Sequence, residues 1–206
     1  MSDIAEYTII LFESDIPELK EILEMSLNLI FFHRNLSNND LEDAQGKLTN
    51  ITYVKLKNED LCQEITNKIN EIEKIFSQEP KLYGYNISLS FFEKIEKRDN
   101  PWERWNFISV MDKKEDLSKK SEVKDNTTNS NIDKENKVRE YMFKLIEKLN
   151  DKGNHMPIVD LNDNNLKDET FLHKFKTEKV QNKEEYLSLF NNYMQKNQDD
   201  IIVINI

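Results

Sequence analysis

Side chains that could do chemistry are spread thinly along this chain. The three histidines, His33, His155 and His173, lie in separate segments, and no two of them have the spacing that places paired imidazoles on one helix face. Cys62 is the single cysteine, so neither a paired-thiol metal site nor an internal disulfide is available. The sequence therefore predicts no metal centre.

Motifs for nucleophilic catalysis and phosphate binding are absent as well. No Gly-x-Ser-x-Gly turn presents a serine, and the three glycines, Gly46, Gly84 and Gly153, are too far apart to form a phosphate-binding loop. The adjacent carboxylates of Glu59 and Asp60 suit the first turn of a helix, where they complement the helix dipole. We therefore expect a protein that is not an enzyme and that binds no cofactor.

The most informative side chains are aromatic. Trp102 and Trp105 lie in the segment PWERWNF at residues 101–107, and large aromatic rings dominate either a core or an interface. A spacing of three residues puts the two indoles on opposite faces of a regular strand, whereas Trp105 and Phe107 share one face. Either one indole is in the core and the other lies at the surface or under a loop, or both are buried. A bulge would bring the two together.

Charge and composition narrow the class of partner. The formal net charge of -10 and the sequence pI near 5.0 repel phosphate backbones, so we expect no nucleic-acid partner. The first residues carry no basic region, and no stretch approaches the ~20 apolar residues of a membrane-spanning helix. We expect a soluble protein without direct membrane insertion. Its single cysteine fits the reducing cytoplasm or nucleus.

The apolar patterns predict a single α+β domain over residues 1–206 with a largely antiparallel sheet. Helices are expected at 15–34, from a cap at Asn58 to Phe76, at 135–152 and at 183–196. Strands are expected at 7–13, 51–56, 85–95, 102–111, 155–159, 171–180 and 201–206. Polar composition predicts loops at 35–50 and 160–169, and a disordered insertion at 112–133.

Two of these elements can be placed relative to others. The helix at 15–34 is apolar on most sides, and a helix of that kind is usually surrounded by other elements, so we expect it near the middle of the domain. The strands at 85–95 and 102–111 flank a turn-forming segment and are expected to form an antiparallel hairpin.

Several short segments together resemble one family. They are FHR at 32–34, ITYVKL at 51–56, EDL at 59–61, SLSFFEK at 88–94, PWERW at 101–105 and HMP at 155–157. In this order, over about residues 5–160, they are similar to the HORMA-domain family and, within it, to the autophagy-related protein 101 family. The residues that carry the resemblance are His33, Arg34, Pro101, Trp102, Glu103 and Trp105.

The resemblance implies a HORMA fold, in which a central, mostly antiparallel sheet is backed by three long helices. It also implies a non-catalytic adaptor of the autophagy-initiation kinase complex. Such an adaptor pairs as a heterodimer with the HORMA domain of autophagy-related protein 13, stabilises it and through it meets the kinase. The implied location is the cytoplasm, with recruitment to the site of autophagosome formation.

HORMA pairs commonly use the third long helix for the dimer contact. By analogy, the partner-binding residues here would be Arg139, Met142, Phe143 and Ile146. The alternative is that Met142 and Ile146 are core residues.

The chain departs from the family pattern between the two hairpin strands. Family members usually carry an exposed Trp-Phe finger there, which is thought to recruit downstream factors, whereas residues 96–100, EKRDN, hold no aromatic side chain. The sequence therefore does not predict finger-dependent recruitment by this chain. The polar insertion at 112–133 is also longer than the family pattern suggests, and little beyond residue 170 matches.

A second kind of HORMA adaptor fits part of the same pattern. Spindle-checkpoint and translesion-polymerase adaptors trap a partner peptide under their C-terminal segment, here residues 165–206, and ERWNF at 103–107 also resembles the checkpoint protein. Pro101, Trp102 and the ungapped N-terminal third favour the autophagy family. A third class, an enzyme, would need a concave polar pocket with clustered titratable groups, which the sequence does not indicate.

Overall fold

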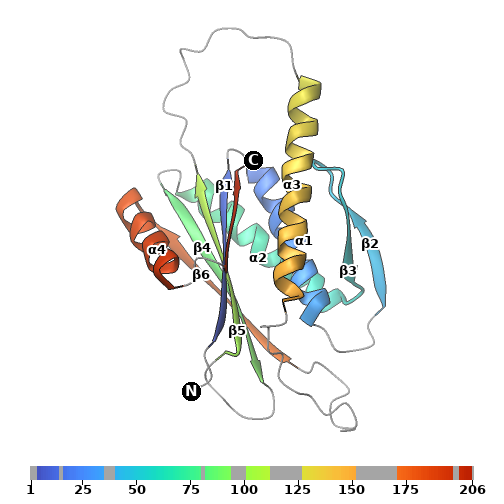
Figure 1. The fold of residues 1–206 in the computed structure, drawn as a ribbon, viewed down its shortest axis with the longest axis horizontal. Coiled ribbons are helices and arrows are strands. Elements are labelled where there is room, and N and C mark those ends of the chain that lie inside the picture. The colour runs from blue at the N-terminus through green and yellow to red at the C-terminus, as the bar shows by residue number, and fades with distance from the viewer. Residues whose placement is uncertain are drawn as a thin grey trace.

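The helices and strands follow the apolar patterns of the sequence. The computed structural model describes residues 4–13, 16–34, 40–79, 82–93, 101–111, 127–151, 171–196 and 200–205. The elements are, in chain order, β1 (Ala5–Glu13), α1 (Ile16–Arg34), β2 (Leu41–Gln45), β3 (Thr52–Leu56), α2 (Glu59–Gln78), β4 (Gly84–Glu93), β5 (Glu103–Met111), α3 (Thr127–Leu149), β6 (Phe171–Val180), α4 (Lys183–Lys196) and β7 (Ile201–Asn205) (Figure 1). The predicted strand at 155–159 and the predicted loop at 160–169 lie outside the described residues.

Five of the described strands form the central sheet, in the order β6-β4-β5-β1-β7. The strand β4 runs antiparallel to both of its neighbours, β5 and β6, so the predicted hairpin is confirmed. The strand β1 runs parallel to both β5 and β7. The remaining strands, β2 and β3, form a separate antiparallel hairpin. Antiparallel pairs thus outnumber parallel ones among the described strands.

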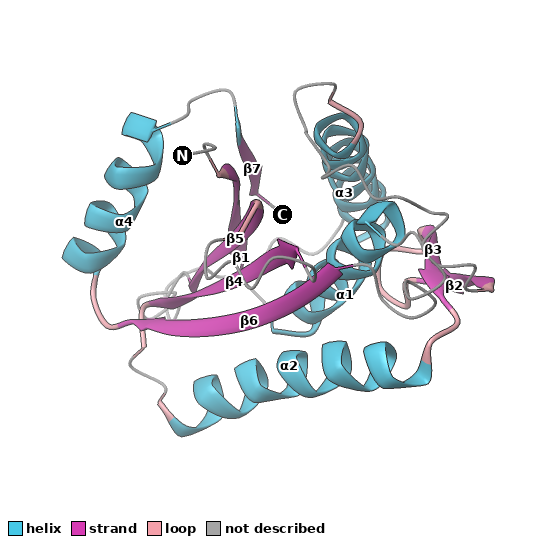
Figure 2. Cartoon of the chain, turned by 90° about the horizontal axis from the view of Figure 1, so that it is seen from below, coloured by secondary structure: helices cyan, strands magenta, loops and turns pink. Residues whose placement is uncertain are grey.

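Helices cover the two faces of the sheet unequally. The helices α1, α2 and α3 lie on one side, and α4 lies on the other, as two perpendicular views show (Figures 1 and 2). Side chains from all sides of α1 are buried, among them Leu19, Ile22, Leu27 and Ile30, because α1 contacts the sheet, α2, α3 and β3. The predicted α+β fold, with a HORMA-like sheet backed by three long helices, is confirmed.

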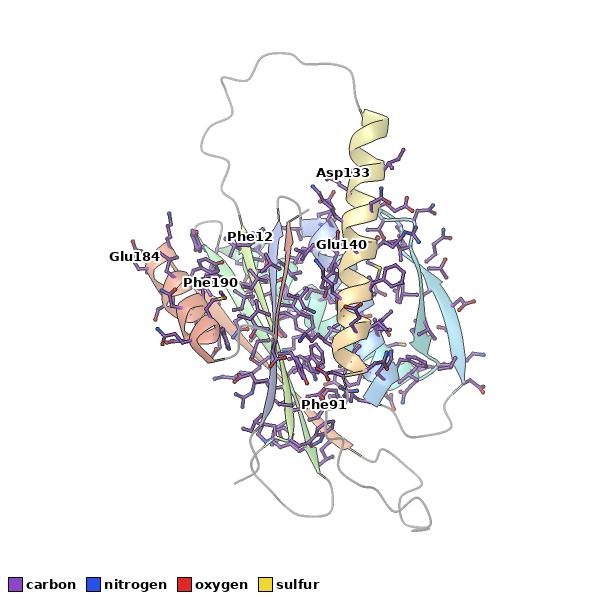
Figure 3. All side chains as sticks on the ribbon, viewed as in Figure 1. Phe12, Phe91, Asp133, Glu140, Glu184 and Phe190 are labelled. Atoms are coloured by element: carbon purple, nitrogen blue, oxygen red, sulfur yellow. The ribbon has the colours of Figure 1, made fainter. Side chains whose placement is uncertain are left out.

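The short helix α4 closes a second, smaller apolar cluster on the opposite face of the sheet. Tyr186 of α4 packs there with the buried side chains of Ile108, Val110 and Val180. Phe190 also packs against this cluster from α4, and Figure 3 shows it between that helix and the sheet. The amphipathic pattern of 183–196 therefore serves to cover one end of the sheet.

The predicted loop at 35–50 contains a strand, which corrects the sequence prediction. Residues 41–45 form β2, whose side chains alternate between exposed and half-buried positions. The turn after β2 is held from outside, because the carboxylate of Glu21 on α1 accepts hydrogen bonds from the backbone N–H groups of Lys47, Leu48 and Thr49 at 2.8 Å each. The Thr49 hydroxyl donates a fourth bond at 2.6 Å. A hairpin stabilised in this way needs few apolar residues of its own.

The predicted disordered insertion is also corrected at its C-terminal end. The helix α3 begins at Thr127, so residues 127–133 are helical, while residues 112–126 lie outside the described part of the chain. Ion pairs support these early turns. Lys134 pairs with Glu18 of α1 at 2.5 Å, and Lys137 pairs with Asp133 one turn earlier at 3.1 Å. The helix therefore begins before the buried apolar side chains of its described part, which start at Val138.

No described helix combines the length and the apolar character needed to cross a membrane. Among the same residues, no group of three or more His, Cys, Asp or Glu side chains is arranged to hold a metal ion.

Candidate partner-binding face and motif cluster

The helix α3 is fixed to the domain along one side. Its buried side chains are Val138, Tyr141, Met142, Leu145 and Leu149. The Tyr141 hydroxyl shares a 2.6 Å hydrogen bond with the Ser26 hydroxyl of α1, and burial raises the pKa of Tyr141 well above its ordinary value. At the C-terminal end of the helix, Lys148 pairs with Asp200 beside β7 at 3.2 Å.

A second side of α3 carries apolar groups that the domain does not cover. Phe143 is 61% exposed and Ile132 is 55% exposed. Eleven residues make about three helical turns, so these two side chains lie on the same side of the helix. Arg139, which is exposed, and Ile146, which is half-buried, lie next to them. We call Ile132, Arg139, Phe143 and Ile146 the α3 stripe.

The α3 stripe faces away from β7. Lys148, which points toward β7, is about 140° around the helix axis from Phe143. The opposite side of α3 is the side on which the β2–β3 hairpin lies (Figures 1 and 2). That hairpin exposes two leucines of its own, Leu41 and Leu48, of which Leu48 lies in the turn held by Glu21.

The structure separates the four predicted contact residues into two groups. Arg139 and Phe143 are exposed, and Arg139 pairs with Glu135 one turn earlier on the same helix at 2.6 Å. Met142 is buried in the core, and Ile146 packs against the core from a half-buried position. For Met142 the alternative prediction, a core residue, is therefore correct. Arg139, Phe143 and part of Ile146 are accessible to a partner.

The sequence patterns did not single out three exposed apolar residues, namely Ile132 on α3, Leu41 on β2 and Leu48 in the turn after β2. Ile132 had a signal, since its spacing to Phe143 is that of three helical turns, but it fell in the segment expected to be disordered. Leu41 and Leu48 had none, because they lay in a segment expected to be a loop.

Three motif residues meet in a buried cluster. The Arg34 Nε lies 3.0 Å from both carboxylate oxygens of Glu103, and its Nη2 lies 2.9 Å from Oε2. The Trp105 indole N–H donates to Glu103 Oε1. The Arg34 and Glu103 side chains are only 3% and 0% exposed. We call Arg34, Glu103 and Trp105 the motif cluster.

The motif cluster continues into the sheet and into α3. The ring of Tyr7 on β1 stacks on Trp105 with 4.3 Å between centroids, and burial, with a smaller contribution from Glu103, raises the pKa of Tyr7. The Arg34 Nη1 donates to the main-chain carbonyl of Leu149 at 3.3 Å. One buried guanidinium therefore joins the end of α1, the start of β5 and the end of α3.

The other motif residues lie around this cluster. Pro101 is buried and Trp102 is half-buried just before β5, and the Trp102 ring lies 5.9 Å from that of Phe91. His33 is half-buried beside the ring of Phe32, and burial, together with the neighbouring Arg34 charge, lowers the pKa of its imidazole. Trp105 is thus the indole in the core. Trp102 is half-buried, which is intermediate between the exposed and the fully buried positions that the sequence allowed for it.

Comparison with known proteins identifies the family. The family model described as Autophagy-related protein 101 matches residues 12–163, more than half of the chain. The chain belongs to this family. A curated relative, Autophagy-related protein 101 of Arabidopsis thaliana, is 25% identical over 162 residues, which cover 69% of this chain and 75% of that protein.

Membership of the autophagy-related protein 101 family gives the chain an autophagy-related role and confirms the resemblance inferred from the sequence. The matched residues include Arg34, Glu103, Trp105 and the whole α3 stripe. The elements β6, α4 and β7 follow the matched range.

Proposed function

We propose that the chain is a non-catalytic adaptor that pairs with the HORMA domain of autophagy-related protein 13 and stabilises it within the autophagy-initiation kinase complex. The observation that carries this proposal is the exposure of Phe143 on α3, in a member of the autophagy-related protein 101 family. The proposed contact is the α3 stripe.

The composition of the α3 stripe supports a protein partner. Interface energy is usually concentrated in a few aromatic and arginine side chains ringed by less important contacts, and the stripe offers Phe143 and Arg139 with Ile132 and Ile146 beside them. A stable pair buries on the order of 1,600 Å² in total, more than one helix stripe supplies. The β2–β3 hairpin, which lies on that side of α3 (Figure 1) and exposes Leu41 and Leu48, would extend the contact.

The proposed setting is the cytoplasm, with recruitment to the site of autophagosome formation through the partner and the kinase. The formal net charge of -10 argues against nucleic acid or an anionic membrane surface as the primary partner. The partner would therefore bring the chain to a membrane, rather than the chain inserting into one.

Binding to the partner's HORMA domain tests the proposal. Phe143→Asp places a charge in the centre of the proposed contact, and we expect at least about a 30-fold loss of affinity, the effect of removing an interface hot spot. Affinity is measured by titration calorimetry with the purified HORMA domain of autophagy-related protein 13 from the same organism, and complex formation by sedimentation. Leu187→Asp is the matched control, because Leu187 is 42% exposed but lies on α4, across the sheet.

Two results would overturn the proposal. One is the absence of a complex between that HORMA domain and the unaltered chain. The other is an equal loss of affinity in the Phe143→Asp and Leu187→Asp variants. Recovery of a short peptide trapped under residues 165–206, in place of a second HORMA protein, would favour the alternative kind of HORMA adaptor.

A further inference from the structure

We infer that the buried Arg34–Glu103 pair is a positioning device, which fixes the C-terminal end of α3 and thereby the α3 stripe. Arg34 and Glu103 would be positioning residues for partner binding without touching the partner. This inference rests on the proposed function, because it assigns a role to residues behind the proposed contact.

The Arg34 guanidinium lies where the ends of two helices and the start of one strand meet. Arg34 is the last residue of α1, Glu103 is the first residue of β5, and Leu149 is the last residue of α3. Arginine has five N–H donors in a planar fork, and here one edge grips the carboxylate while Nη1 reaches the Leu149 carbonyl at 3.3 Å. The last carbonyls of a helix lack partners within the helix, so a cation at this end satisfies one of them and complements the helix dipole.

The burial of the pair indicates that its role is positional. Removing two charges from water costs as much as their attraction returns, so a buried pair adds little net stability compared with apolar groups of similar volume. Its hydrogen bonds are directional, however, and apolar groups cannot reproduce the bond from Arg34 to Leu149. The pair is therefore suited to hold the end of α3 in one place.

The end of α3 lies close to the α3 stripe. Leu149 is three residues after Ile146 and six after Phe143, a rise of roughly 9 Å along the helix axis. A second side-chain anchor in this turn is the pair between Lys148 and Asp200, whose side chains are 23% and 30% exposed. Ion pairs that water reaches are screened, so Arg34 is the stronger constraint on this turn.

Two variants test the inference. In R34M/E103Q both charges are removed, while the glutamine oxygen can still accept the Trp105 indole N–H. In R34K the charge is kept, but an ammonium group cannot grip the carboxylate at two atoms and reach Leu149 at the same time. The second variant guards against a failure of the first to fold.

The readouts are hydrogen exchange without any partner, partner affinity and the urea midpoint of unfolding. In both variants we expect exchange of the amides of residues 145–149 to accelerate at least tenfold relative to those of 138–141. We also expect affinity for the autophagy-related protein 13 HORMA domain to fall at least tenfold. A purely structural role would instead change exchange evenly along α3 together with the urea midpoint.

Even acceleration along α3, or unchanged affinity alongside local acceleration, would overturn the inference. Failure of the proposed function is distinguishable, because then the unaltered chain itself binds no partner. In that case the hydrogen exchange along α3 still shows whether the Arg34–Glu103 pair positions the end of that helix.

Discussion

Trp105 makes two contacts of different kinds, and a single substitution separates them. Trp105→Phe keeps an aromatic ring against Tyr7 but removes the indole N–H that donates to Glu103. Because the carboxylate is buried, losing a donor is expected to lower the free energy of unfolding by about 1–3 kcal/mol. Urea unfolding followed by circular dichroism measures the change.

Trp102→Phe is the control for that substitution. Trp102 is half-buried and lies outside β5, so its truncation should cost less than that of Trp105. An equal or greater loss of stability in Trp102→Phe would contradict the role assigned to the buried indole.

At the level of single residues, the sequence predicted which face of a strand a side chain lies on, but it did not predict which side chains touch each other. Alternation placed Trp105 and Phe107 on one face, and both are fully buried. It did not apply to Trp102, because β5 begins one residue later. The contact between Arg34 and Glu103 spans 69 residues, and neither residue carries a local signal of its partner. The resemblance brought these residues to attention without indicating that they touch.

Two glycines illustrate how different elements tolerate a methyl group. A Cβ at Gly84, the first residue of β4, would overlap the main-chain carbonyl of Ser109 on β5. A Cβ at Gly46 would overlap the ends of the Glu21 and Thr49 side chains, which can move at the expense of their hydrogen bonds. Backbone in a sheet cannot move as freely as the end of a side chain.

We therefore expect Gly84→Ala to lower the free energy of unfolding by about 3 kcal/mol and Gly46→Ala by about 1 kcal/mol. Chemical denaturation of both variants measures the difference. Lys47→Ala, an exposed change in the same turn as Gly46, should stay within about 0.5 kcal/mol of the unaltered chain. The reverse order of the two glycine variants would contradict this account of the sheet and the turn.

At the level of elements, local periodicity identified the long helices, and elements without it were missed. The helix α2 matched both in its cap, where Asn58 accepts from the Leu61 N–H at 3.0 Å, and in its buried stripe of Ile65, Ile69, Ile72 and Phe76. The strand β2 was missed because the turn that follows it depends on Glu21, more than twenty residues earlier. The start of α3 was missed because the buried apolar side chains described for this helix begin at Val138, while the cited ion pairs before that residue involve Asp133, Lys134 and Lys137.

For the molecule as a whole, we expect the free energy of unfolding to fall in alkali, because burial shields several tyrosine hydroxyls from water. Burial, as the main cause, raises the pKa of Tyr7, Tyr53 and Tyr141 from the ordinary value of 10.0. Above that pH the unfolded chain releases these protons while the folded chain retains them, so rising pH favours unfolding. The stabilisation is fully present below pH 10.0 and declines above it, by up to about 1.4 kcal/mol per pH unit for each tyrosine.

The urea midpoint measured between pH 8 and 11 tests this prediction, with tyrosine ionisation followed by absorbance. Tyr141→Phe removes one of the buried groups, so its midpoint should fall less steeply with pH. An identical slope in this variant would show that the pH dependence has another source, such as the lysines.

At this largest scale the α+β class followed from composition and pattern, whereas the order and direction of strands did not. The β-branched and aromatic composition of 7–13 and the position of 102–111 after a turn-forming segment mark both segments as strands, but they do not say that β1 and β5 run parallel. Whether two strands pair in parallel depends on how the connecting helices pack on the sheet in the folded domain. The family resemblance implied a mostly antiparallel sheet backed by three long helices, and the parallel pairing of β1 with β5 and β7 was not part of that expectation.

The parallel pairing of β1 with both β5 and β7 has a consequence for how the sheet assembles. Both partners lie far along the chain, so long loops must close before β1 is paired, which slows folding. Until β7 docks, β1 presents an open edge lined by Ile9, Ile10 and Leu11, the kind of surface on which misassociation between copies begins. A growing or shortened chain that lacks the five residues of β7 is therefore expected to aggregate more readily than the full chain.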